Sequence, residues 1–233
     1  MPQLSIPARF NGPPSSGNGG YSCGAVAAFI DGVARVRLHS PPPLDKPLPV
    51  YVATDGSVEV FDGELLVASG FPASLQLDVP PAPSLEQARR GRENFPVLDD
   101  HLYGTCFVCG NNRPHADGLA LYPGPVDDWS LLACTWQPAP DLADDAGMVL
   151  PEIVWSALDC PGCYAAMGDA MQPVLLGELR ASLLAPVPAA EELIVYAWPL
   201  GREGRKLYGG VAIANQSGVV LACSHTTWIT LKS

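Results

Sequence analysis

The sequence is poor in charged residues, and poorer still in basic ones. Asp, Glu, Lys and Arg make up 16% of its 233 residues, and 13 Lys and Arg stand against 24 Asp and Glu, for a formal net charge of −11. Binding to nucleic-acid phosphates needs clustered basic side chains, so this balance argues against a non-specific nucleic-acid-binding protein. An anionic small ligand remains compatible, because a local basic patch can lie on an acidic protein.

Long apolar runs and secretory signals are also lacking. No stretch approaches the ~20 apolar residues that a membrane-spanning helix needs, and the N-terminus lacks the basic-then-apolar pattern of a signal peptide. The seven cysteines are an odd number without a secretory context. This favours reduced thiols, and we expect a cytoplasmic protein that does not bind membranes.

Apolar residues and turn formers, in contrast, are abundant. Apolar residues make up 48% of the sequence, with 25 Pro and 23 Gly. This composition is typical of a globular, turn-rich protein rather than a disordered one. The length fits one large domain or two small ones.

One supersecondary unit occurs twice along the chain. A helix of small residues after positions 18–20 and a helix at 150–167 are each followed by β-rich segments. Three pairs of these segments correspond, namely 35–38 with 179–183, 50–52 with 193–196, and 63–69 with 218–224. An internal repeat decides the whole fold, so we expect a pseudo-dimer within one chain, with any site at the join.

Each helix is expected to lie inside a curved antiparallel sheet. Residues 21–31 are apolar nearly all round, which is typical of a buried helix, and burying it requires the sheet to fold around it. The expected class is therefore α+β, with two long helices each wrapped by a sheet. We expect a shorter N-terminal repeat (residues 1–75), a linker with a short exposed helix (76–104) and a C-terminal repeat (105–233). A strand is also predicted at 119–122.

Three separated motifs in the second half occur in an order that resembles a known family. Residues 106–121 are similar to the CFxCGxxNPxGLxL leader of hotdog-fold acyl-CoA thioesterases of the PaaI-like superfamily. Residues 155–159 resemble the LxD-type centre of their hotdog helix, and 204–229 resemble their closing strands. The match covers residues 101–231, and the N-terminal half is similar to the first half of tandem (double) hotdog proteins.

The resemblance implies hydrolysis of an acyl-CoA thioester, which needs a carboxylate and hydrogen-bond donors for an oxyanion. Asp159 is the expected carboxylate, because a charge within an apolar helix is costly unless it has a partner or a function. Pro161 should kink the helix beside it. Asn18, Gly19 and Gly20 open the first helix, whose unpaired N–H groups can hold an oxyanion. The alternatives are a solvent-facing Asp159 at a helix end and a merely flexible glycine loop.

The second helix by itself carries an incomplete set of these residues. Glu152 lies where PaaI-like enzymes usually carry HGG, and it is better explained as an acid that favours a helix N-terminus. We therefore expect a composite site that takes its glycines from the first half. Basic residues near the end of the chain are predicted to bind the phosphates of CoA, and a solvated hairpin turn is the alternative for them. Two residues of the second helix complete the predicted substrate contacts. These predicted substrate-binding residues are Arg202, Arg205, Lys206, Glu152 and Trp155.

The cysteines form two CxxC pairs, at 106/109 and 160/163, and formally make up a Cys₄ zinc set. Their separation of about fifty residues exceeds the usual ribbon spacing, and the resemblance accounts for the first pair without a metal. We therefore expect no metal, and no cofactor other than the coenzyme A of a small-molecule thioester.

Two other functions stay open on the same fold. One is a non-catalytic protein that binds acyl-CoA or a similar hydrophobic thioester. The other is an enoyl-CoA hydratase or dehydratase, which would need an Asp/His pair facing one pocket. A homodimer of tandem repeats also stays open, since the hotdog sheets of the family that the sequence resembles commonly associate edge to edge.

Overall fold

The structure is a computed structural model that describes residues 2–96, 103–114 and 117–231. The described residues form one antiparallel sheet in the order β1-β3-β4-β5-β2-β8-β11-β10-β9-β7-β6. Its strands are β1 (Gln3–Leu4), β2 (Ala34–Leu38), β3 (Leu48–Val52), β4 (Val58–Asp62), β5 (Leu65–Pro72), β6 (Gly124–Pro125), β7 (Leu132–Trp136), β8 (Val174–Leu183), β9 (Leu193–Glu203), β10 (Lys206–Ala214) and β11 (Val220–Thr230). The α-helices are α1 (Gly19–Ala27), α2 (Leu85–Glu93), α3 (Pro151–Ala157) and α4 (Cys160–Met167), and 3-10 turns lie at Ala8–Phe10 and Pro140–Leu142.

The strand order contains the same unit twice. From one edge to the centre it reads β1-β3-β4-β5-β2, and from β7 to the centre it reads β7-β9-β10-β11-β8. The two halves join where β2 and β8 pair antiparallel, with Ala34 opposite Ala181. The predicted segment pairs fall on β2 and β8, β3 and β9, and β5 and β11, so the duplication and the α+β class are confirmed.

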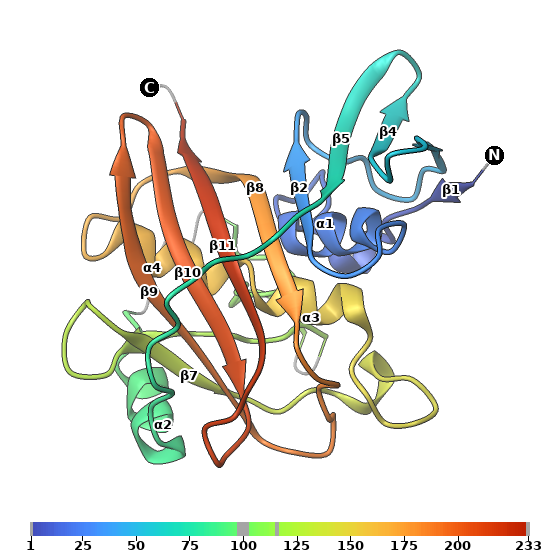
Figure 1. The fold of residues 1–233 in the computed structure, drawn as a ribbon. Coiled ribbons are helices and arrows are strands. Elements are labelled where there is room, and N and C mark those ends of the chain that lie inside the picture. Colours follow the sequence, from blue (N-terminus) through green and yellow to red (C-terminus); the bar gives the residue numbers. More distant parts are fainter. Residues whose placement is uncertain (1, 97–102, 115–116, 232–233) are drawn as a thin grey trace.

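Helices α1, α3 and α4 lie on one face of the sheet (Figure 1), and α2 packs on the other face. Helix α1 packs on β2 and β5, α4 packs on β9 and β10, and α1 contacts α3. The α1–α3 contact is unusually close: a Cβ on Gly20 would lie 2.6 Å from the Trp155 carbonyl oxygen, and one on Gly24 would lie 2.7 Å from Glu152 Cα. Glycine is therefore needed at both positions for the two helices to touch backbone to backbone.

The predicted kink in the second helix is a full interruption. Helix α3 ends at Ala157 and α4 begins at Cys160, with Asp159 between them at φ −97° and ψ −89°. Pro161 lacks an N–H and cannot continue the hydrogen-bond ladder, which accounts for the break. The first helix also ends before the predicted end at Asp31. The N–H groups of Phe29 and Ile30 donate to the carbonyls of Val26 and Ala27, three residues back, which is the 3-10 pattern and not the α-helical one.

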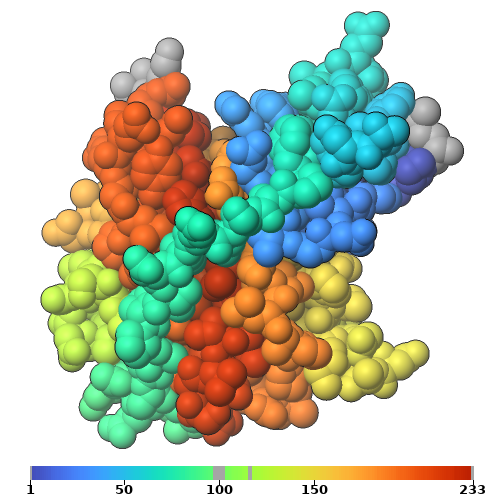
Figure 2. Space-filling view, viewed as in Figure 1, coloured from blue at the N-terminus to red at the C-terminus, as the bar shows by residue number. Residues whose placement is uncertain are grey.

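The predicted linker is more buried than expected. After β5, the chain crosses the outer face of β8, β11 and β10 and reaches α2 (Figures 1 and 2). Leu75, Leu77 and Val79 pack there on a second apolar cluster that includes Tyr196. Helix α2 is not wholly exposed, because its Ala88 is buried. Positions 97–102 of the linker lie outside the described residues, and the division of the chain at 75 and 105 stays a prediction.

The strand predicted at 119–122 does not form. The Leu119 and Leu121 N–H groups donate to the carbonyls of Phe107 and Val108, so this segment holds the 106–110 turn instead of joining the sheet. Among the described helices, none is long and apolar enough to span a membrane.

Candidate functional site

A cavity of about 470 Å³ lies where the two halves meet. The first half contributes the loop before α1 and the segment after β2, and the second half contributes the start of β8, the end of β11 and the break between α3 and α4. Much of the lining is apolar, with few polar side chains. The apolar lining residues include Leu38, Pro41, Pro42, Val174, Leu176, Trp228 and Ile229, and the polar ones include Asn18, His39, Ser40 and Asp159.

Asp159 is the buried carboxylate of this cavity, with 1% of its surface exposed. Its Oδ2 accepts hydrogen bonds from the Gly20 N–H at 2.8 Å and from Asn18 Nδ2 at 2.9 Å. Its Oδ1 has no hydrogen-bond partner among the residues that the structure describes. One oxygen is thus held in place by the first half, while the other is buried without a hydrogen-bond partner among the described residues.

Burial changes the proton affinity of this carboxyl group. Removal from water raises the pKa of Asp159 to about 7, and the hydrogen bond from the Gly20 N–H opposes that rise only in part. The charge of Cys106 contributes to the raised pKa, and the hydrogen bond from Asn18 opposes it. A carboxyl group with a pKa near neutrality can take up and release a proton at physiological pH, as a general base must.

Asn18 is fixed by two roles at once. Its side-chain oxygen accepts from the Tyr21 N–H at 2.9 Å and caps α1, which orients the amide so that Nδ2 faces Asp159. Asn is among the preferred N-cap residues for this reason. The prediction that Asn18 opens the first helix is correct, and the structure adds its contact with the carboxylate.

Gly19 and Gly20 differ in what their amides do. The Gly20 N–H is used by Asp159. The Gly19 N–H, at the first position of α1, donates to no acceptor within the described part of the chain, and Gly19 lines the cavity. A Cβ at Gly19 would lie 2.7 Å from Leu176, so glycine is required for the close packing there. Of the two predicted oxyanion donors, the geometry leaves Gly19 available.

Two predicted substrate contacts lie away from the cavity lining. Trp155 is buried in the α1–α3 contact, where its Cβ would be 2.8 Å from a Cβ on Gly24. Glu152 lies beside the same glycine, and its charge adds to burial in raising the pKa of Tyr21 to about 12. Their substrate-binding roles stay predictions, without a cavity contact to support them.

The predicted basic cluster lies on the β9–β10 hairpin and is exposed. Arg205 Nη1 donates to the Thr230 carbonyl at 3.3 Å, and Lys206 pairs with Ile229 across the sheet. Ile229 is itself a lining residue. Arg202 lies on the same hairpin, opposite Leu207. The cluster is therefore next to one wall of the cavity.

His39 lines the cavity, although the sequence alone did not identify it as a site residue. Its Nε2 lies 2.8 Å from Ser69 Oγ, and partial removal from water together with the charge of Arg37 lowers its pKa. Because His39 and Asp159 come from different halves, only the repeat with its central join could have indicated that they share a cavity.

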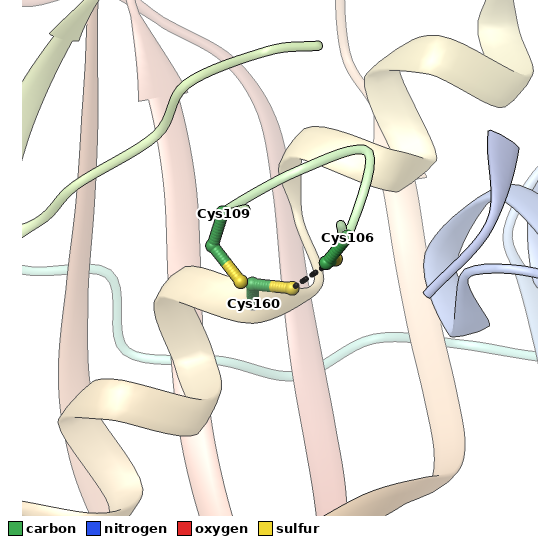
Figure 3. A group of neighbouring side chains, drawn as sticks. All are labelled: Cys106, Cys109 and Cys160. Atoms are coloured by element: carbon green, nitrogen blue, oxygen red, sulfur yellow. Dashed lines mark hydrogen bonds between the residues drawn. The ribbon is translucent and has the colours of Figure 1, made fainter. Parts of the chain in front are cut away.

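Three cysteine sulfurs converge on one space (Figure 3), and one of them belongs to Cys160, the residue directly after Asp159. Those of Cys106, Cys109 and Cys160 all lie within 4.8 Å of one another, and the first and last are 3.8 Å apart. Hydrogen bonds from its neighbours, Cys109 first, hold the pKa of Cys106 well below its ordinary value. All seven cysteines of the chain are free thiols. Of the two predicted CxxC pairs, Cys163 stays outside this group.

The pseudo-symmetry of the two halves relates the Asp159 site to an equivalent position, and that position lacks the carboxylate and the glycine. Counted from the first helical residue, Asp159 is equivalent to Ala27, and Gly20 is equivalent to Glu152. The equivalent position therefore has neither the carboxylate nor the glycine. The described residues thus hold one such carboxylate site rather than two.

Comparison with known proteins supports the fold. No known family model matches the chain, and no curated protein matches it in sequence. Among solved structures, the chain is similar to the tesB protein of Mycobacterium avium subsp. paratuberculosis (TM-score 0.60, 12% identity, covering 98% of this chain and 91% of that one). It is also similar to the acyl-CoA thioesterase II TesB2 of Mycobacterium marinum (TM-score 0.57, 15% identity, covering 94% of this chain and 90% of that one).

A third similar structure is a conserved protein of unknown function with a hotdog fold from Alicyclobacillus acidocaldarius (TM-score 0.58, 13% identity, covering 99% of this chain and 92% of that one). At these identities the likeness concerns the fold. Together with the duplicated strand order, it shows that this chain has a tandem hotdog fold.

Proposed function

We propose that the protein is a thioester hydrolase that cleaves acyl-CoA at one composite site between its two halves. The observation that carries the proposal is the state of Asp159: one carboxylate oxygen is held by Gly20 and Asn18, and the other lies unpartnered within the described part of the chain. A buried carboxylate that is oriented but not neutralised is suited to activate a water molecule.

The chemistry follows from this geometry. Asp159 takes a proton from water as the water oxygen bonds to the thioester carbonyl carbon, and the Gly19 N–H stabilises the developing oxyanion. The dipole of α1 favours that charge. Collapse of the tetrahedral intermediate breaks the carbon–sulfur bond, and the sulfur takes the proton back from Asp159. The products are a carboxylic acid and a free thiol.

The substrate class follows from the lining of the cavity. Its volume of about 470 Å³ lies within the range of small-molecule sites, roughly 300–1,000 Å³, and its apolar wall suits an acyl chain. Arg202, Arg205 and Lys206 are next to that wall and offer charges for the phosphates of CoA. The similarity to a protein named as an acyl-CoA thioesterase agrees with this class.

A hydratase or dehydratase is the second candidate, and His39 is the observation that favours it. This reaction needs an Asp/His pair at one pocket, and His39 and Asp159 line the same cavity. His39 is, however, exposed and engaged with Ser69. We therefore place hydrolysis first, because Asp159 and Gly19 supply both groups that hydrolysis requires.

The test is thiol release from a panel of acyl-CoAs by the wild type, by Asp159→Asn and by Asp31→Asn, an exposed acid beyond the end of α1. We expect turnover by the wild type and Asp31→Asn, and a loss of ~100-fold or more in Asp159→Asn, since general acid–base groups contribute about 10²–10⁴-fold. Binding of acyl-CoA by an inactive wild type would instead support the binding-protein alternative. Hydration of an enoyl-CoA without thiol release would support the hydratase.

A further inference from the structure

The three clustered sulfurs have the spacing of metal ligands. Cys106 Sγ and Cys160 Sγ are 3.8 Å apart, and Cys109 Sγ completes a set within 4.8 Å. A tetrahedral zinc ion with Zn–S bonds of about 2.3 Å places its sulfur ligands roughly 3.8 Å apart. The three side chains come from two separate parts of the chain and point to one space (Figure 3).

The Cys106–Cys109 turn is built around its first sulfur. The backbone N–H groups of Val108 and Cys109 both donate to Cys106 Sγ, and the Gly110 N–H closes the turn on the Cys106 carbonyl at 2.8 Å. A Cβ on Gly110 would lie 2.5 Å from that carbonyl oxygen and from that of Gly104. Only glycine fits, and the C-x-x-C spacing is the one that zinc sites use.

The surroundings supply hydrogen-bond donors to the sulfurs. Asn18 Nδ2 lies 3.8 Å from Cys106 Sγ and 4.0 Å from Cys160 Sγ, and the Tyr164 hydroxyl donates to Cys109. Outer groups of this kind orient ligands and stabilise their charge in metal sites. A cluster that served only as apolar packing would have no use for donors aimed at each sulfur.

We propose that Cys106, Cys109 and Cys160 bind one zinc ion. An all-thiolate set selects a soft or borderline metal such as zinc over magnesium or calcium. Each cysteine binds the ion as a thiolate. Cys106 and Cys160 line the cavity, so the fourth position is open to a water molecule from that side. The ion ties the 106–110 turn to the first residue of α4, directly after Asp159. The proposal does not depend on the hydrolase assignment.

The experiment uses the full chain, reduced and treated with a chelator, and titrates it with Co²⁺ and with Zn²⁺ against a chromophoric chelator. We expect one ion per chain, a thiolate-to-cobalt charge-transfer band, and the intense visible bands of tetrahedral cobalt. Cys109→Ala should lose the band and more than ~100-fold in zinc affinity, since even outer-shell changes cost about 10–100-fold.

Cys163→Ala is the matched control, because Cys163 lies on the same helix as Cys160 but outside the cluster. It should bind both metals as the wild type does. The proposal is overturned if the wild type takes up neither metal, if it forms a Cys106–Cys160 disulfide and stays metal-free after reduction, or if Cys163→Ala loses as much affinity as Cys109→Ala. The wild-type cobalt spectrum is decisive even if Cys109→Ala fails to fold.

Discussion

The Gly20 N–H donates a 2.8 Å hydrogen bond to Asp159 Oδ2, across 139 positions of sequence. This bond joins the helix of one half to the carboxylate of the other. It forms only because the α1 backbone reaches the backbone of α3 at Gly20. The site and the join between the halves are therefore the same feature, and substitutions there should affect stability and activity together.

Gly20→Ala tests this coupling. The new Cβ would lie 2.6 Å from Asp159 Cβ and from the Trp155 carbonyl oxygen, so the two helices must separate. Overpacking of this kind costs ~1–3 kcal/mol, and the hydrogen bond to Asp159 should be lost with it. We expect a lower free energy of unfolding in urea and a loss of most thioesterase activity. Ala28→Ser, on the exposed end of the same helix, should change neither, and wild-type activity in Gly20→Ala would contradict the coupling.

Asn18 offers a way to separate capping from catalysis. Asn18→Ala removes the cap of α1 and should cost about 1 kcal/mol of stability. Asn18→Ser keeps a capping oxygen for the Tyr21 N–H but lacks the amide that donates to Asp159. We expect thermal denaturation to show near-normal stability for Asn18→Ser alone, while both variants have reduced kcat. Full activity in Asn18→Ser would show that the contact with Asp159 has no catalytic role.

Asp159→Asn should stabilise the protein at neutral and higher pH. The pKa of Asp159 is raised to about 7 by burial, so the folded state favours the protonated carboxyl group. That contribution is complete below the ordinary Asp pKa of about 4 and is lost as the pH rises through 7. An amide escapes this loss. The advantage of Asp159→Asn should therefore grow between pH 4 and 8 to roughly 2–4 kcal/mol.

This advantage is measured by urea unfolding of chelator-treated protein, so that no bound cation alters the charge near Asp159. Asp31→Asn, at an exposed position, should show no such pH trend. If Asp159→Asn is less stable than the wild type at pH 8, the carboxylate is better compensated than its burial indicates.

The architecture was largely predictable because its determinants are local or repeated. The apolar helix at 21–31, the Pro161 break and the alternating strands each depend on nearby residues, and the duplication orders them. The exceptions also have local causes. The 119–122 segment has a strand-like sequence, but its N–H groups donate to the 106–110 turn. The alternation of apolar and polar residues along the segment does not predict that contact.

The site was predictable only where the repeat gave a reason to pair its halves. A composite site followed from the glycines in one helix and the carboxylate in the other. His39 and the convergence of the Cys106, Cys109 and Cys160 sulfurs did not follow, because the groups that meet in space are far apart in sequence: Cys106 and Cys160 are separated by 54 positions. Spacing within one motif could not show that the CxxC turn lies against the start of α4.

The exposed cations of the β9–β10 hairpin give a test of the CoA assignment. If Lys206 and Arg202 contact CoA phosphates, Lys206→Ala should raise KM for an acyl-CoA roughly 2–5-fold, because an exposed ion pair is worth up to ~1 kcal/mol. The kcat should stay unchanged, since these groups lie away from Asp159. The same variant should show no effect on the matching acyl-pantetheine, which has the thioester but no nucleotide phosphates.

The control is Arg90→Ala, which removes an exposed cation on α2 and should leave the KM for both substrates unchanged. Added salt should weaken acyl-CoA binding in the wild type and reduce the difference from Lys206→Ala, because screening acts on exposed charges. An equal rise in KM for both substrates would instead place Lys206 at the acyl end of the cavity, and no rise for either would leave the hairpin as a solvated turn.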